Sequence, residues 1–108
     1  MDSFLKAIGA LNDETRVLFL KFLIVYGKSC VCEFEESFSM LQPRISRHLK
    51  ILKDAGFITS NKEGQRVYYF LNNTDSTLHK NLLKEVENLE LSLPNKVCAC
   101  DIQGARAL

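Results

Sequence analysis

The sequence predicts a mainly α-helical domain with a single β-hairpin, in the order helix, helix, helix, helix, hairpin, helix. Apolar residues recur at helical spacing through the first half, β-branched and aromatic residues then dominate residues 57–71, and a leucine-rich helical seam follows. The 108 residues, 46% of them hydrophobic, suffice for one compact core. No membrane span is predicted, because the apolar run 17–26 is far shorter than the roughly 18 residues required and carries Lys21.

Two helices are expected before Gly27. The apolar face of the first helix comprises Phe4, Leu5, Ile8 and Leu11. Asn12 or Asp13 is suited to cap the second helix, because a short polar side chain accepts hydrogen bonds from the first backbone amides. The apolar positions of this second helix are Val17, Leu18, Leu20 and Leu23. Their density predicts a buried core helix that ends at Gly27.

A shorter third helix is expected at residues 31–38, and a fourth from Gln42 or Pro43 that ends at Gly56. Proline suits the first turn of a helix, since no intrahelical donor is lost there. Residues 57–60 and 67–71 are predicted strands, with the polar residues 61–65 at the hairpin tip. Thr74 or Asp75 is expected to cap the last helix, and Pro94 to end it. Its seam comprises Leu78, Leu82, Val86, Leu89 and Leu93. One domain, residues 1–93, is therefore expected, followed by a tail, residues 94–108.

Basic charge is concentrated in residues 41–70. This segment has six basic and two acidic side chains, a charge of +4, whereas the whole chain carries +1. With the order of the helices and the hairpin, it predicts a winged helix-turn-helix domain that binds double-stranded DNA. The residues expected to contact bases or phosphates are Gln42, Arg44, Ser46, Arg47, His48, Lys50, Lys62, Gln65 and Arg66. For His48 a partly buried structural role is the alternative, because it lies at the margin of the apolar stripe formed by Ile45, Leu49 and Leu52.

Three segments resemble the ArsR/SmtB family of metal-responsive repressors. Residues 42–58 resemble its recognition helix, residues 63–72 its hairpin, and residues 11–16 the start of its second helix. The resemblance implies a homodimer, paired through its first and last helices, that binds an inverted repeat in an operator. Leu41 departs from the family pattern, which commonly has a capping serine there, and Ser39 is expected to take over that role. The family's zinc site on the last helix is not predicted, since Asp75 and His79 are four residues apart and no second histidine follows.

All four cysteines occur as two Cys-x-Cys pairs, Cys30 with Cys32 and Cys98 with Cys100. Residues 29–34 resemble the Cys-Val-Cys-Asp-Leu signature of the thiol-dependent branch of this family. That branch senses arsenite or soft divalent ions, in accord with the preference of thiolates for soft metals. Relatives with a complete single-helix site have a third cysteine where this chain has Glu35. Cys98 or Cys100, of the same chain or of the dimer partner, is therefore expected to complete an As(III) site of three sulfurs.

The sequence does not decide between arsenite and several other inducers. Sb(III) is a further candidate, and all four cysteines together would suit Cd(II), Pb(II) or Zn(II). Oxidation of the paired thiols, which would make the protein a redox-responsive repressor, is another alternative. An enzyme is not expected, because the sequence has no phosphate-binding loop, and neither His48 nor His79 forms an evident pair with a cysteine nucleophile. The N-terminus does not resemble a secretory signal, so a cytoplasmic location with reduced thiols is expected.

The spacing of the first pair suggests a mechanism. Positions two apart on a regular helix point to nearly opposite sides, so Cys30 and Cys32 cannot hold one ion unless the helix start is irregular or becomes distorted. Distortion there would shift the recognition helix and weaken DNA binding. A helix N-terminus lowers a thiol pKa, whereas Glu33, Glu35 and Glu36 oppose that effect, so the sequence leaves the direction of the shift open.

Overall fold

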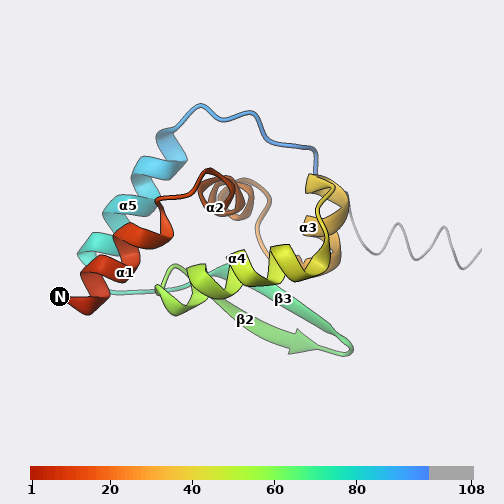
Figure 1. Cartoon of the computed structure of the whole chain (residues 1–108), viewed down its shortest axis with the longest axis horizontal. Helices are drawn as coiled ribbons and strands as arrows, with labels where there is room; N and C mark the ends of the chain where they lie inside the picture. The colour runs from red at the N-terminus through yellow and green to blue at the C-terminus, as the bar shows by residue number, and fades with distance from the viewer. Residues whose placement is uncertain (98–108) are drawn as a thin grey trace, which may run out of the picture.

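The computed structural model describes residues 1–97 and shows five helices and a three-stranded antiparallel sheet. The tail residues Cys98 and Cys100 lie outside the described residues. The elements follow the predicted order (Figure 1). Their bounds are α1 Asp2–Ala10, α2 Glu14–Tyr26, β1 Ser29–Cys30, α3 Val31–Phe38, α4 Gln42–Asp54, β2 Ile58–Glu63, β3 Arg66–Leu71 and α5 Thr77–Asn88. No helix among residues 1–97 is long and apolar enough to cross a membrane.

Helix α2 forms the centre of the core, as its apolar density predicts. Phe19 and Phe22 are fully buried, and their rings pack against Phe34 and Phe38 of α3 with centroid separations of 4.8–5.2 Å. Tilted ring pairs at this separation add to the free energy gained by burial of their apolar area. The aromatic cluster therefore fixes α3, the helix that carries Cys32, onto the rest of the fold.

Asp13 caps α2, one of the two predicted alternatives, and accepts a hydrogen bond from the Arg16 backbone N–H at 3.2 Å. The Arg16 side chain then connects three helices. Its Nε donates to the carbonyl of Ala10 at the end of α1 at 2.8 Å, and its Nη1 donates to Nδ1 of His48 on α4 at 3.4 Å. Arg16 thus joins α1, α2 and α4.

The start of α4 corrects one expectation. Ser39 does not cap α4; it is the C-cap of α3, in the left-handed conformation at φ 54°. Leu41 is the N-cap residue of α4 and makes no side-chain capping bond, while Pro43 lies in the first turn as predicted. The buried stripe of α4 comprises Ile45, His48, Leu49 and Leu52. The remaining sides of the helix face solvent, which is the arrangement that a recognition helix requires.

The sheet contains one strand that periodicity does not reveal. β1 pairs with β3 through Ser29 opposite Tyr69 and Cys30 opposite Tyr68, giving the strand order β1-β3-β2. A two-residue strand is too short to show an alternating pattern. The predicted hairpin tip at residues 61–65 is also too wide, because pairing of β2 with β3 continues to Glu63 opposite Arg66. Gly64, at φ 65°, permits the resulting two-residue turn.

Helix α5 is shorter than predicted at both ends. Ser76 is the cap, rather than Thr74 or Asp75, and its hydroxyl accepts from the His79 backbone N–H at 3.3 Å. The helix ends at Asn88, so Leu89 and Leu93 lie beyond it and Pro94 does not end it. The segment after α5 instead runs across the molecule to α3 (Figure 1).

Candidate functional site

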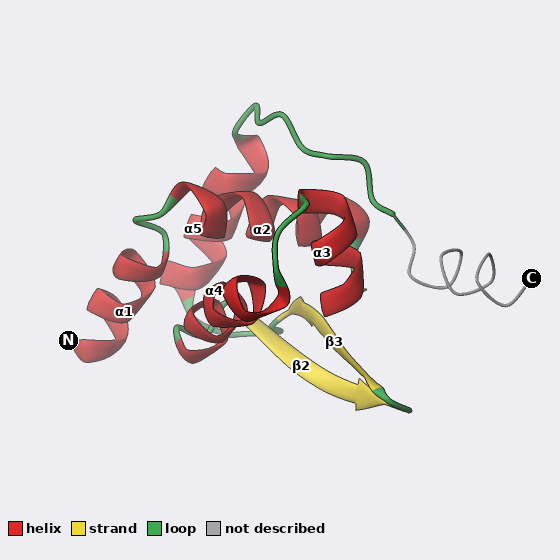
Figure 2. Cartoon of the chain, turned by 45° about the vertical axis from the view of Figure 1, so that its right-hand side comes forward, coloured by secondary structure: helices red, strands yellow, loops and turns green. Residues whose placement is uncertain are grey.

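The predicted DNA-contacting residues lie on α4 and on the β2–β3 hairpin, two neighbouring parts of the fold (Figure 2). At the start of α4, the exposed members are Gln42, Arg44, Arg47 and Lys50, and Ser46 is partly exposed. In the hairpin, Lys62 and Gln65 are exposed and Arg66 is partly exposed. All eight therefore have accessible surface from which a nucleic acid could be contacted.

One hydrogen bond links α4 to the hairpin, and one ion pair links the hairpin to Lys28, which precedes β1. Lys53 of α4 donates to the hydroxyl of Ser60 in β2 at 2.8 Å, which links the helix to the hairpin. Lys28 forms a 2.7 Å ion pair with Glu63 near the hairpin turn and lies 5.1 Å from the ring centroid of Tyr68. Lys28 and Glu63 are 35 residues apart in sequence, so their contact could not be predicted from local spacing.

His48 is different from the other predicted contacts, because it is only 4% exposed. Its ring packs edge-on against Phe19, and its Nδ1 accepts from Arg16. An arginine can only donate, so this contact requires that nitrogen to be without a proton. The burial argues against DNA contact by His48 and favours the structural alternative.

The burial of His48 gives an expected pH dependence. Burial is the largest of several influences that hold the pKa of His48 below its usual value; Arg16, Arg47 and Arg44 act the same way and Asp13 opposes them. The unfolded chain therefore binds a proton at His48 before the folded chain does, so stability falls as the pH drops below about 6.5. We expect this group to contribute a slope of up to about 1.4 kcal/mol per pH unit to the free energy of unfolding. Urea denaturation between pH 5 and 7.5 should show a flatter profile for His48→Gln, and an unchanged slope would contradict this.

Cys30 and Cys32 lie at the start of α3 in different environments. Cys30 is the N-cap residue, in extended conformation at φ −91° and ψ 165°, and is 1% exposed. Cys32 lies inside the helix and is exposed. Because Cys30 is not part of the regular helix, the helix start is already irregular, which is one of the two conditions that the spacing demanded.

A capping box surrounds Cys30. The Glu33 carboxylate, 5% exposed, accepts from the Cys30 backbone N–H at 3.0 Å, and the Cys30 sulfur takes the position of the usual capping oxygen toward the Glu33 amide. Burial raises the pKa of the Cys30 thiol to about 11; the Glu33 amide lowers it, and the negative charge of Glu33 raises it further. In this conformation Cys30 is a protonated thiol. The Cys-x-x-Glu spacing could have signalled this box, had cysteine been considered as a capping residue.

The described part of the segment after α5, residues 89–97, reaches α3. The Val97 backbone N–H donates to the Ser37 hydroxyl at 3.0 Å. The ammonium group of Lys96 donates to the Lys28 carbonyl at 3.0 Å and lies 3.6 Å from the Glu33 carboxylate. These contacts were not predicted, because nothing in the local pattern of the tail indicates where it packs.

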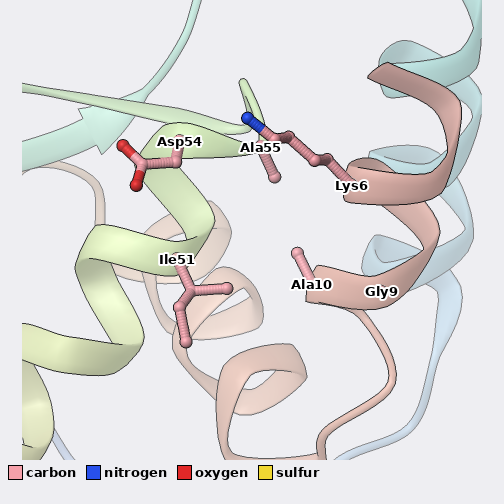
Figure 3. Close-up of a pocket in the computed structure, with 6 residues that line it drawn as sticks. All are labelled: Lys6, Gly9, Ala10, Ile51, Asp54 and Ala55. Carbon is pink, nitrogen blue, oxygen red and sulfur yellow. The ribbon is translucent and has the colours of Figure 1, made fainter. Parts of the chain in front are cut away.

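The described residues do not by themselves complete a metal site. Among residues 1–97, no group of three or more His, Cys, Asp or Glu side chains is placed to hold an ion. His79 is engaged in the core, where its ring nitrogens bond the Ser76 hydroxyl at 2.7 Å and the Ala55 carbonyl at 2.6 Å. A pocket of about 320 Å³ between α1 and α4 is lined by Lys6, Gly9, Ala10, Ile51, Asp54 and Ala55 (Figure 3). Its lining has no thiol, so it offers nothing to a soft ion.

Comparison with known proteins identifies the family. Residues 13–60 match the family described as "Bacterial regulatory protein, arsR family". An uncharacterised HTH-type transcriptional regulator of Methanocaldococcus jannaschii is 39% identical over 80 residues, which is 74% of this chain and 86% of the relative. The chain belongs to the arsR family. An arsenical resistance operon repressor of Staphylococcus aureus is 33% identical, with 83% of this chain and 81% of the relative aligned.

Other arsR-family relatives are matched over a smaller part. A cadmium resistance transcriptional regulatory protein CadC homolog of Staphylococcus aureus is 38% identical, over 61% of this chain and 54% of the relative. The chain spans 48–63% of the length of two further arsenical resistance operon repressors and two arsenic resistance transcriptional regulators, which it matches at 39–42% identity. The family consists of DNA-binding regulators, which agrees with the prediction of a regulator rather than an enzyme.

Two solved structures share the fold. Reduced HlyU from Vibrio cholerae has a TM-score of 0.69 at 25% identity, covering 84% of this chain and 92% of that one. The homodimeric winged helix-turn-helix domain Mb0332 from Mycobacterium bovis has a TM-score of 0.63 at 26% identity, covering 82% and 83%. The predicted winged helix-turn-helix fold is therefore confirmed.

Proposed function

We propose that this arsR-family protein is a cytoplasmic, homodimeric repressor that binds operator DNA and leaves it when cysteine thiolates bind arsenite. The observation that carries the proposal is the position of Cys30 and Cys32 at the start of α3, directly before the helix that presents Arg44 and Arg47. Three thiolates in a pyramid are the ligand set that As(III) takes. Two come from this pair, and the third comes from Cys98 or Cys100.

The position of Val97 supports a third sulfur ligand from the same chain as Cys30. Val97 bonds Ser37, which is seven positions after Cys30, a rise of about 10 Å along a helix. Cys100 is three residues beyond Val97, and extended chain covers about 3.3 Å per residue. A tail cysteine of the same subunit is therefore within reach of Cys30.

Two features of the fold support coupling between ion binding and DNA release. Cys30 must leave its capping and buried position to bind an ion, which disturbs the start of α3 and, through it, α4. Cys30 also pairs with Tyr68 in β3, so the movement of Cys30 would displace the hairpin as well. The two predicted DNA-contacting elements, α4 and the hairpin, are therefore both connected to Cys30. Movement of Cys30 on ion binding would displace both of them from the arrangement that binds DNA.

The homodimer is supported by an apolar surface on α1. Phe4, Leu5 and Ile8 are 51%, 56% and 41% exposed, although the sequence places them on an apolar face. Exposed neighbouring apolar side chains favour association. A symmetric dimer through α1 and α5 would cover them, and the Mycobacterium bovis neighbour is a homodimer.

One alternative has a specific observation in its favour. The relative described as a cadmium resistance regulator makes a four-sulfur site for Cd(II) or Pb(II) a second candidate. A redox-responsive repressor would, like the arsenite sensor, require the buried Cys30 to leave its position, whereas Cys32 is already exposed.

Operator release titrated with different ions distinguishes these functions. Fluorescence anisotropy of labelled operator should show release by arsenite at lower concentration than by antimonite, cadmium, lead or zinc. The Cys98→Ser/Cys100→Ser double variant should need about ten times more arsenite, since it loses the third sulfur. Release by cadmium alone would favour the four-sulfur alternative, and no release by any of these ions would refute the proposed function.

A further inference from the structure

The ammonium group of Lys96 connects the two ends of the segment that carries Cys30 and Cys32. It donates to the Lys28 carbonyl at 3.0 Å and lies 3.6 Å from the Glu33 carboxylate. Both cysteines lie between these two points in the chain. The side chains of Lys96 and Glu33 are only 20% and 7% exposed, so solvent screens this ion pair less than it screens a surface pair.

The carboxylate that faces Lys96 also holds Cys30 in its buried position. One oxygen of Glu33 accepts from the Cys30 backbone N–H at 3.0 Å, and the other faces the ammonium group of Lys96. Cys30 is paired with Tyr68 of β3 as well, and it is 1% exposed. We call residues 28–33 the thiol segment. Its two ends and its central residue are thus held by contacts that meet at Glu33 and Lys96.

A further contact fixes the backbone beside Lys96. The Val97 N–H donates to the Ser37 hydroxyl at 3.0 Å, and Ser37 is buried. Ser37 follows Glu33 by four positions, so the two residues lie on the same side of α3. Residues 96–97 therefore contact α3 at two positions one turn apart, which keeps Lys96 in place between the ends of the thiol segment.

We propose that Lys96 restrains the thiol segment in its ion-free form and so sets the arsenite concentration at which the repressor responds. This inference rests on the proposed function, in which Cys30 must leave its buried position to bind an ion. Because Lys96 contacts both ends of the thiol segment, a movement that exposes Cys30 disturbs the contacts of Lys96. The free energy of these contacts therefore opposes ion binding.

Such a restraint affects two different measurements by the same factor. Cys30 must become accessible before it binds an ion and before a neutral reagent alkylates it, so both processes depend on the same opening equilibrium. If loss of Lys96 makes opening about tenfold more frequent, alkylation of Cys30 should be about tenfold faster. Operator release should then need about tenfold less arsenite. Operator affinity without arsenite should not change, because the closed form still predominates.

Full-length Lys96→Ala, Lys96→Arg and Lys80→Ala test the inference, the last being an exposed lysine on α5 that serves as control. Anisotropy measures operator release by arsenite. Iodoacetamide alkylation is measured in chains whose other three cysteines are replaced by serine, relative to the rate in guanidinium. Lys96→Ala should change both quantities about tenfold in the directions given. Lys96→Arg should restore both, since a guanidinium group can reach the same two acceptors, and Lys80→Ala should match wild type.

Ser37→Ala provides a second variant that leaves the charges unchanged. It removes the acceptor of the Val97 N–H, so it should also speed alkylation of Cys30, by a smaller factor that does not add to that of Lys96→Ala. Urea separates local opening from a general loss of stability, because alkylation through global unfolding accelerates steeply with urea and local opening does not. For Lys96→Ala we expect a shallow dependence on urea.

Three results would overturn the inference: unchanged alkylation of Cys30 in Lys96→Ala, a higher arsenite requirement for release, or a steep urea dependence of the faster alkylation. Failure of arsenite to release the wild-type protein from its operator would instead refute the proposed function. The alkylation rates would in that case still report whether Lys96 holds Cys30 in its buried position.

Discussion

Cys32→Ser should bind operator DNA as tightly as wild type and yet require at least about 100 times more arsenite for release. Cys32 is exposed on α3, so serine should leave the fold and the predicted DNA-contacting residues unchanged. Serine keeps its proton and offers a hard oxygen, whereas a soft ion requires thiolate sulfur. Hundredfold weaker response corresponds to about 2.7 kcal/mol of lost coupling. Anisotropy titrations of operator complexes measure both quantities.

Two companion variants sharpen this result. Cys30→Ser should behave alike, and because serine is a better capping residue than cysteine, its melting temperature should not fall. Glu36→Gln, an exposed position on the same helix, should respond to arsenite as wild type does. Release of Cys32→Ser at the wild-type arsenite concentration would remove Cys32 from the site.

The double substitution Arg44→Ala/Arg47→Ala should weaken operator binding by about 100-fold or more. Both side chains are exposed in the first turns of α4, where an arginine that contacts guanine contributes about 1–3 kcal/mol to discrimination. Loss of two positive charges also removes phosphate neutralisation, so the salt dependence of the binding constant should become shallower by up to about two units. Binding isotherms at several salt concentrations, with operator and with unrelated DNA, measure these effects.

The pattern of loss identifies the role of each arginine. If one of them contacts a base, its single substitution should weaken operator binding far more than binding to unrelated DNA; a phosphate contact should weaken both equally. Lys80→Ala/Lys84→Ala, which removes two exposed positive charges from α5, is the control for net charge. Equal binding by the double variant and this control would exclude α4 as the recognition helix. Thermal unfolding should be unchanged in all variants, because the replaced side chains are exposed.

Local patterns were sufficient for most of the fold. The apolar density of α2, the capping residue Asp13, the proline in the first turn of α4 and the β-branched strands each act within a few residues of chain. Each was found in the structure. Boundaries that depend on competing caps were less secure: three neighbouring polar residues could begin α5, and the interaction of Ser76 with His79 decides among them.

The sequence alone determined that this protein is a winged helix-turn-helix regulator of the arsR family, with a pair of cysteines shortly before its predicted recognition helix. Only the tertiary structure decided that His48 faces the core, that Cys30 belongs to a strand as well as to a helix cap, and that residues 96–97 lie on α3. The physical reason is that caps, turns and periodic faces arise from neighbours in the chain. Burial of a particular side chain, and contacts such as that of Lys96 with Glu33, depend instead on segments more than sixty residues apart that meet only in the folded state.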